Sequence, residues 1–229
     1  MQTVMIDGRN AQLPSRQRER AKEERRRALL TAAAAGLASG EFSMRRIAER
    51  AGVSEVTPYN LFGSKHELLT ALYRESVRGI ADRIPAGADP LARLFAAIDR
   101  FRDSIAADPA FHRALFNARQ ESRRGRSLIV RSDEGVDYWH RLVEAVIAAE
   151  GISANVSAAA LPRHFMYLLN GATQEWIDGA IDADEWRAAV LHGFALLALP
   201  LASRQAEGTL RRTLADAAAA LPDFARAGQ

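Results

Sequence analysis

Hydroxyl, amide, aromatic and cationic side chains follow one another at short intervals between residues 43 and 65. The segment holds Ser43, Arg45, Ser54, Val56, Thr57, Tyr59, Asn60 and Lys65. Hydroxyl and amide groups exchange hydrogen bonds with base edges or phosphate oxygens, and a cation neutralises a phosphate. An apolar side chain such as that of Val56 fits a thymine methyl group. This chemistry is that of contact with double-stranded DNA rather than of catalysis.

Two short helices are predicted to position these side chains. Ser43 can cap the first helix, and Gly52 ends it. The start of the second is open: either Ser54 caps a helix over residues 55–62, or Thr57 is the cap and Pro58 opens a shorter helix. Two such helices joined by a glycine turn are typical of a helix-turn-helix at residues 43–62, whose second helix reads the major groove.

The run IAERAGVSEVTPYNLFGSKHELL, residues 47–69, resembles the signature of the tetracycline-repressor (TetR) family. The matching groups are Ile47-Ala48, Ala51-Gly52-Val53-Ser54, Tyr59, Phe62, Ser64-Lys65 and Glu67-Leu68. The resemblance covers roughly residues 25–75 and implies a transcription regulator. Two positions depart from the family pattern, which commonly has glycine in place of Val56 and an apolar residue in place of Pro58.

The resemblance also implies roles for individual residues. Tyr59 and Lys65 match positions that contact phosphate. Base or phosphate contacts are implied for Ser54, Val56, Thr57 and Asn60. Ser43 and Arg45 match positions near the start of the first helix that meet the DNA backbone. Because of Pro58, the phosphate contacts are firmer expectations than any base contact.

The basic residues are concentrated in the first third of the chain. Residues 1–83 carry 15 Lys and Arg against 10 Asp and Glu, or +5, whereas the remainder carries 16 against 18, or −2. The stretch Arg16–Arg27 is charged on all sides, so it is expected to be a solvated helical face. A second use for its N-terminal end, with Arg16 and Arg18, is contact with phosphates or a minor groove.

Metal binding, catalysis and membrane insertion receive no support. The chain has no cysteine, and its histidines, at positions 66, 112, 140, 164 and 192, form no metal-ligand pair. No nucleophile–base spacing or glycine-rich phosphate loop is present, so we expect no catalytic residues and no cofactor. The longest apolar run, Phe194–Ala202, is far shorter than a membrane span. A soluble, cytoplasmic protein without a secretory signal is expected.

Apolar residues at three- and four-residue steps predict an all-α protein of about ten helices: an N-terminal three-helix unit followed by a larger helical bundle. Residues 1–15 are expected to be a flexible tail. Residues 16–84 are expected to form the DNA-binding domain, including a connecting helix at 64–84, and 85–229 a ligand-binding and dimerisation domain. The bundle helices are predicted at about 90–107, 109–122, 127–150, 157–179, 183–205 and 209–221, with Pro162 and Pro200 kinking or interrupting two of them.

A ligand site between bundle helices is expected in the second domain, because facing helices place such sites. The candidate residues are aromatic side chains and polar groups embedded in apolar helices: Phe101, Phe116, Trp139, His140, Phe165, Asn170 and Gln174. Each is equally explained as a core or interface residue. The family resemblance further implies a homodimer through the helices at 157–179 and 183–205. Residues compatible with that contact are Leu168, Gly171, Ala172, Leu191, Ala195 and Leu199.

The expected function is a homodimeric transcription regulator, a ligand-responsive repressor of a palindromic operator, whose partners are double-stranded DNA, a second copy and a small, mainly apolar effector. Two other hypotheses remain open. One is an all-helical enzyme or small-molecule carrier whose N-terminal unit docks partners. The other is an architectural protein that binds DNA without sequence preference.

Overall fold

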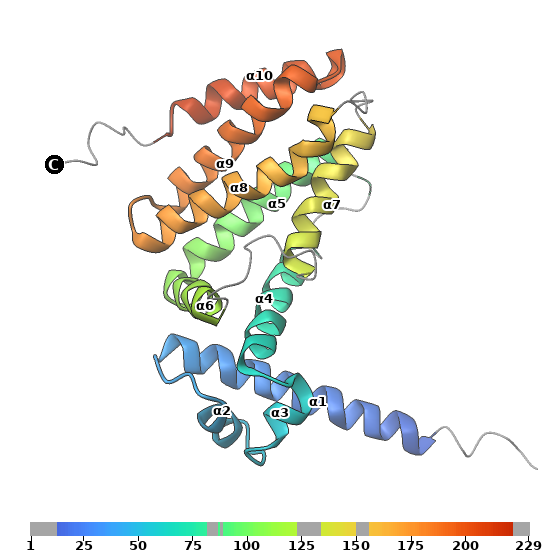
Figure 1. Ribbon diagram of the computed structural model, residues 1–229, viewed down its shortest axis with the longest axis vertical. Helices are drawn as coiled ribbons and strands as arrows, with labels where there is room; N and C mark the ends of the chain where they lie inside the picture. Colours follow the sequence, from blue (N-terminus) through green and yellow to red (C-terminus); the bar gives the residue numbers. More distant parts are fainter. Residues whose placement is uncertain (1–12, 82–86, 88, 123–133, 150–155, 222–229) are drawn as a thin grey trace, which may run out of the picture. The chain divides into compact units, whose positions relative to one another are not determined.

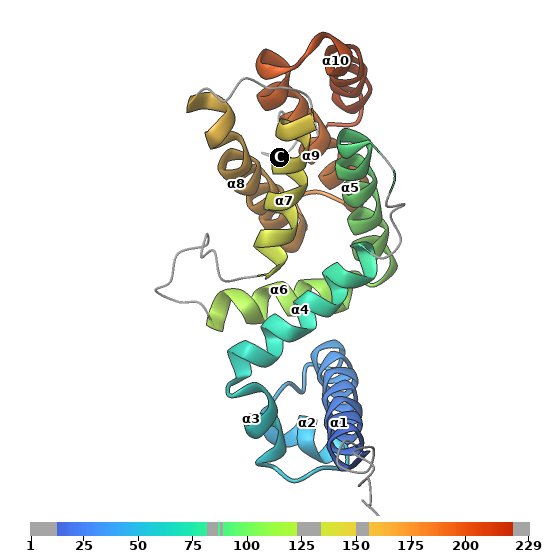
Figure 2. The same ribbon diagram turned by 90° about the vertical axis from the view of Figure 1, so that its right-hand side faces the viewer.

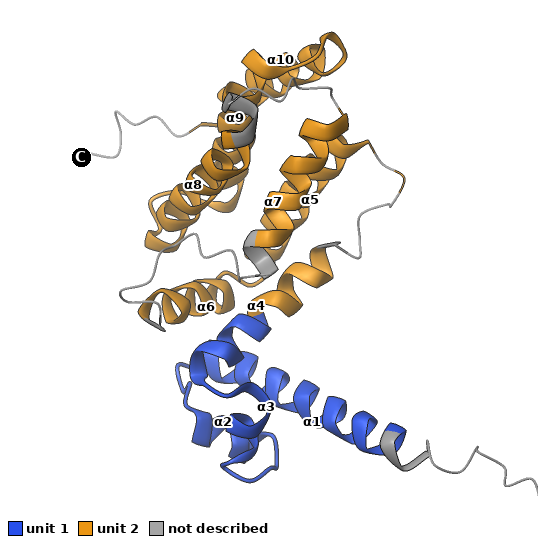
Figure 3. Cartoon of the chain, turned by 45° about the vertical axis from the view of Figure 1, so that its right-hand side comes forward, with its two compact units in different colours: residues 1–72 blue, residues 73–229 orange. Residues whose placement is uncertain are grey.

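The computed structural model describes residues 13–81, 87, 89–122, 134–149 and 156–221 (Figure 1). Within these ranges the regular structure consists of ten α-helices and one 3-10 helix, so the predicted all-α class is confirmed. The chain divides into two compact units, Met1–Leu72 and Tyr73–Gln229 (Figure 3). The boundary falls inside helix α4, Lys65–Ala81.

Unit 1 consists of α1 (Leu13–Ala38), α2 (Met44–Arg50), α3 (Thr57–Phe62) and the first half of α4. Helices α1 and α2 pack together, as do α2 and α3. Their shared core is made of aliphatic side chains and one phenylalanine: Leu29, Ala33, Leu37, Met44, Ile47, Ala48 and Phe62. This core holds two helices of only seven and six residues, which are too short to be stable alone in water.

The ends of two helices in unit 1 differ from the sequence-based bounds. α1 begins at Leu13, so residues 13–15 are helical and not part of a tail, and residues 1–12 lie outside the described part of the chain. α4 begins at Lys65 after Ser64, whose hydroxyl accepts a hydrogen bond from the Glu67 amide at 3.1 Å. Ser64 therefore caps the start of α4.

Unit 2 contains a ring of four packed helices. These are α5 (Pro90–Ala107), α7 (Glu134–Ala149), α8 (Val156–Asp178) and α9 (Ala183–Ala198). Each packs against the next, and α9 returns to α5 (Figures 1 and 2). α6 (Pro109–Ser122) lies against α5 and α8, and α10 (Arg204–Ala218) lies along α9.

A chain of aromatic rings runs through this bundle. Phe101 of α5 packs against Trp186 of α9 with tilted rings whose centroids are 4.9 Å apart, and it meets Trp139 of α7 edge to face at 5.8 Å. Trp139 meets Phe165 of α8, which meets Phe194 of α9 at 5.6 Å. All five side chains are at most 3% exposed. Large apolar rings with this burial dominate the energy of a core.

Proline separates the last two helices. α9 ends at Ala198, a 3-10 turn spans Leu199–Leu201, and α10 begins at Arg204 with Ser203 as its cap. The predicted helices at 183–205 and 209–221 were therefore wrong at their junction, although an interruption at Pro200 was expected. Pro162, by contrast, lies inside a continuous α8. The first residues of the predicted helix at 127–150 fall outside the described residues, and the described helix α7 begins at Glu134.

His112 of α6 is buried with a defined hydrogen-bond pattern. Its Nδ1 lies 2.8 Å from the Asp108 carbonyl, which only accepts, so Nδ1 carries the proton. Its Nε2 lies 3.1 Å from the Ser104 hydroxyl and accepts from it. Burial lowers the pKa of His112 below its usual value, although the Asp108 carbonyl opposes this effect.

We therefore expect His112 to lower the stability of the fold in acid. Because its pKa is lower in the folded than in the unfolded chain, the unfolded chain binds more protons, and the free energy of unfolding falls as pH drops below about 6.5. Urea unfolding at pH 8.0 and 5.5 measures the change. The His112→Gln variant should lose less stability between these pH values. An equal loss in both proteins would show that His112 does not contribute.

Candidate functional site

The turn between α2 and α3 places the two short helices. Gly52 adopts φ +67°, a conformation that favours glycine, and Gly63 ends α3 with φ +79°. α3 begins at Thr57 with Pro58 as its second residue, and no side-chain cap bond forms at Val56. Helix α3 thus starts late, close to the shorter of the two expected forms, but Thr57 is its first residue and not its cap.

The outer side of α3 presents apolar and polar groups together. Val56 is 61% exposed and Tyr59 53% exposed, and Asn60 is also exposed. Phe62, on the other side, is only 8% exposed. Val56 and Tyr59 are therefore both surface residues. They lie three residues apart at the start of α3 and are both exposed, which makes this side of the helix a candidate contact surface.

The hydroxyl groups near this helix are already engaged. Ser43 caps α2 by accepting a hydrogen bond from the Arg46 amide at 3.2 Å. The hydroxyls of Ser54 and Thr57 lie 2.8 Å apart and share a hydrogen bond, while the Thr57 amide donates to the Ser54 carbonyl. In the Ser54–Thr57 pair one hydroxyl hydrogen is left to donate outward, because a single bond uses one of the two.

Arg45 stands in a network of ion pairs. Its Nε is 3.1 Å from a Glu49 carboxylate oxygen and 3.3 Å from one of Glu55. The Glu49 hydrogen bond, followed by the charge of Glu55, raises the pKa of Arg45 above its ordinary value. Arg46 and Arg50 pair with Glu41 in the same way. The arginines of α2 are therefore balanced by carboxylates on the surface of unit 1.

Lys65 differs from these arginines. It is exposed, and its ammonium group lies 5.2 Å from the centroid of the Phe42 ring, a cation–π contact that leaves its charge available. Arg16 and Arg18 of α1 are also exposed. Further along α1, Arg26 lies over the Phe62 ring at 4.7 Å. The basic stretch is thus solvated at its start and packed at its end.

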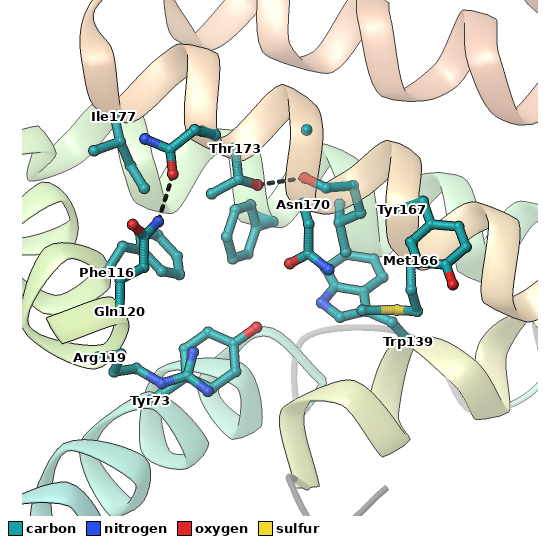
Figure 4. A pocket seen from close by; sticks show the side chains of 14 residues that line it. Tyr73, Phe116, Arg119, Gln120, Trp139, Met166, Tyr167, Asn170, Thr173 and Ile177 are labelled. Carbon is teal, nitrogen blue, oxygen red and sulfur yellow. Dashed lines mark hydrogen bonds between the residues drawn. The ribbon is translucent and has the colours of Figure 1, made fainter. Parts of the chain in front are cut away.

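Unit 2 contains a cavity of about 380 Å³. Aromatic and aliphatic side chains form most of its wall, from α4, α5, α6, α7 and α8: Tyr73, Phe101, Phe116, Trp139, Met166, Tyr167, Leu169 and Ile177. Arg119, Gln120, Asn170, Gly171, Thr173 and Gln174 complete the lining (Figure 4). This size and mixture are typical of small-molecule sites.

Five of the seven expected ligand residues line this cavity: Phe101, Phe116, Trp139, Asn170 and Gln174. Phe165 instead packs among the aromatic rings of the core. His140 lies outside the lining, and its Nδ1 is 3.2 Å from a Glu144 carboxylate oxygen. Among the polar lining residues, the sequence analysis missed Arg119, Gln120 and Thr173. Helical spacing could have identified them, because residues three or four positions apart lie on the same face of a helix. Arg119 and Gln120 follow Phe116 at this spacing, and Thr173 follows Asn170.

The residues expected at a dimer contact fall into two groups. Ala172, Leu191 and Ala195 are buried inside unit 2. Leu168 packs within the chain against Gly193, where an added Cβ would lie 2.6 Å from a Leu168 methyl carbon. Gly171 is exposed and Leu199 half-buried. On the same two helices Tyr167 and Leu196 are both 52% exposed.

Two searches of the described residues gave negative results. No group of three or more histidine, cysteine, aspartate or glutamate side chains in that part of the chain is placed to hold a metal ion. None of its helices combines the length and the apolar character needed to cross a membrane.

Comparison with known proteins gives one family and several solved structures. Residues 29–72 match the model of bacterial regulatory proteins of the tetR family. A TetR transcriptional regulator from Rhodococcus sp. RHA1 is similar with a TM-score of 0.59 at 20% identity, over 77% of this chain and 97% of that one. No curated protein matches.

Two further structures share the fold. The R. erythropolis transcriptional repressor QsdR, from the TetR family, has a TM-score of 0.51 at 22% identity, over 79% of this chain and 96% of that one. A tetR-family regulator from Streptomyces coelicolor has a TM-score of 0.52 at 22% identity, over 88% and 91%. The TetR resemblance of the sequence is confirmed: this is the helix-turn-helix, all-α fold of those regulators.

Proposed function

We propose that this chain, a TetR-type transcriptional regulator by its residues 29–72 and its fold, is a homodimeric repressor that binds a palindromic operator in the cytoplasm and responds to a small effector. The observation that carries the proposal is the exposed pair Val56 and Tyr59 on the helix-turn-helix.

The DNA contacts are proposed to divide by position. Val56, Thr57 and Asn60 face the major groove from the start of α3. Tyr59 contacts a phosphate, and Lys65 neutralises another from the start of α4. Ser43, Arg45 and Ser54 contact the backbone, where Arg45 must exchange a carboxylate for a phosphate. Arg16 and Arg18 extend the basic surface along α1.

A second copy of the chain is proposed to cover the exposed apolar side chains of α8 and α9. Tyr167 and Leu196 provide the apolar centre, and Gly171 allows close approach because it has no side chain. Leu168 and Leu199 lie at its edge, whereas Ala172, Leu191 and Ala195 support the two helices from inside. A two-fold dimer presents two α3 helices and therefore reads a palindrome.

The cavity of unit 2 is the proposed effector site, and α4 is the proposed link to DNA. Tyr73 of the cavity and Lys65 lie on this one helix, eight residues or about 12 Å apart along its axis. An effector that shifts α4 therefore moves the residues that follow α3. An effector that releases DNA must bind the DNA-free form more tightly.

Selection from random duplexes tests this function. The purified protein is expected to enrich a palindrome whose half-sites lie about one helical turn apart. Failure of a folded dimer to enrich any sequence would favour the carrier or enzyme hypothesis. Tight binding at low salt without enrichment would favour an architectural DNA-binding protein.

The selected operator then allows a test of Lys65. In Lys65→Ala we expect the slope of log affinity against log salt to become shallower by about one unit, because one fewer counterion is released. The matched control is Lys22→Ala, which removes the other lysine of the chain from an exposed position on α1. An unchanged slope and affinity in Lys65→Ala would rule out the phosphate contact.

A further inference from the structure

The walls of the unit 2 cavity are mainly apolar. Phe101, Phe116 and Tyr73 present rings, and Met166 provides a flexible side chain that adapts to an irregular shape. At about 380 Å³ the space suits a molecule with one or two rings rather than a nucleotide or a peptide. Many apolar molecules fit such walls, so the polar groups of the lining decide which class of ligand is preferred.

The indole nitrogen of Trp139 is a donor of the lining without an acceptor. It is completely buried, in a side chain only 1% exposed, and it has no hydrogen-bond partner in the described part of the chain. Figure 4 shows the nitrogen-bearing ring of this indole facing the other side chains of the lining. A buried donor in this state is rare in folded proteins, because it has lost its bond to water and gained none in return.

Three other polar side chains of the lining are bonded within the protein. The Thr173 hydroxyl donates to the Leu169 carbonyl at 2.7 Å and accepts from the Trp186 indole at 3.1 Å. Gln120 donates a hydrogen bond to the side-chain oxygen of Gln174. Because these side chains bond to one another or to the helices, they place no comparable demand on a ligand.

We propose that the effector is a mainly apolar, ring-bearing carbonyl compound. Its carbonyl oxygen accepts from the Trp139 indole, which can only donate, and its ring lies against Phe101 and Phe116. The Asn170 amide carries both a donor and an acceptor, so it tolerates the carbonyl without requiring it. A pure hydrocarbon would leave the indole unpaired. This assignment rests on the proposed function, because it gives the chemistry of the effector at the same cavity.

Calorimetric titration of the DNA-free protein compares ketones with the hydrocarbons in which a methylene group replaces the carbonyl. The pairs are 1-tetralone with tetralin, benzophenone with diphenylmethane, and 4-phenylbutan-2-one with butylbenzene. For at least one pair, the ratio of ketone affinity to hydrocarbon affinity is expected to fall about fivefold or more in Trp139→Phe, the contribution of one ordinary hydrogen bond. Comparing this ratio between proteins cancels the different hydration of the two ligands. An unchanged ratio in every pair, or no ketone binding to the original protein, overturns the proposal.

Trp176→Phe is the matched control. Trp176 is another buried indole of unit 2, 2% exposed, but it is not in the lining, so the affinity ratio should be that of the original protein. Trp139→Phe also removes volume from the wall. Replacement of Trp139 by 3-benzothienylalanine keeps the shape of the ring system, puts sulfur in place of the N–H group, and should lower the ratio to the same extent. A ratio that is unchanged by this replacement overturns the proposal, because shape and not the donor would then be responsible.

The two proposals fail separately. The titrations contain no DNA, so they decide the ligand chemistry even if no operator is enriched. If the preferred ketone also lowers affinity for a selected palindrome, it acts as the effector. A ketone that binds through Trp139 but leaves operator affinity unchanged overturns its role as effector. Enrichment of a palindrome without any ketone preference that depends on Trp139 retains the regulator and overturns the carbonyl.

Discussion

The Leu196→Arg variant is expected to be a monomer whose affinity for a palindromic operator is lower by at least about a hundredfold. Leu196 is 52% exposed on α9, at the proposed contact with a second copy. Two-fold symmetry would bring in two arginines, each a charge without a partner in an apolar contact, which costs several kcal/mol. A hundredfold corresponds to about 2.7 kcal/mol.

Sedimentation velocity and operator titration measure these two effects. Ala106→Arg is the matched control, because it adds the same charge at an exposed position on α5 and should leave both unchanged. Affinity for a single half-site should be similar in all three proteins, since the helix-turn-helix is untouched. A dimeric Leu196→Arg protein with normal operator affinity would place the interface elsewhere.

The Trp186→Ala variant is expected to lose about 3–5 kcal/mol of unfolding free energy. Trp186 is fully buried between α9 and α5, where it stacks on Phe101. Its indole also donates to the Thr173 hydroxyl at 3.1 Å, and Thr173 in turn donates to the Leu169 carbonyl. Removing the indole leaves a cavity, removes the ring contact with Phe101 and removes the hydrogen bond between α9 and α8.

Trp186→Phe separates packing from hydrogen bonding. It retains a ring against Phe101, and Thr173 still satisfies Leu169, so its cost should be clearly smaller than that of alanine. Urea unfolding at a fixed protomer concentration measures both variants, because association contributes to the stability of a dimer. A loss below about 1 kcal/mol in Trp186→Ala would mean that the ring chain is not the centre of the bundle.

Local signals predicted the helix-turn-helix well because capping and glycine chemistry act over a few residues. Gly52 and Gly63 take the positive φ angles that end α2 and α3, and Ser43 caps α2 as expected. The start of α3 was harder to predict, since two starts compete within one turn. In the structure α3 begins at Thr57 without a side-chain cap, and the hydroxyls of Ser54 and Thr57 bond to each other.

Features that depend on packing between distant helices were not predictable from local patterns. Arg119 looks like an ordinary surface arginine in the sequence, and only the approach of α6 to Tyr73 buries it. Likewise, Leu191 and Ala195 have the apolar character of an interface, but the packing of α9 inside unit 2 buries them. Periodicity gives the apolar face of a helix, not the partner that covers it.

All three tryptophans of the chain, Trp139, Trp176 and Trp186, belong to unit 2. Light absorbed at the red edge of the protein spectrum therefore excites only the tryptophans of unit 2. Their fluorescence does not report on the unfolding of unit 1. Far-ultraviolet circular dichroism, in contrast, reports helices of both. Melting curves recorded by these two signals will superimpose if the units unfold together, and will separate if unit 1 unfolds on its own. The natural tryptophans thus allow the cooperativity of unfolding between the two units to be measured without an added label.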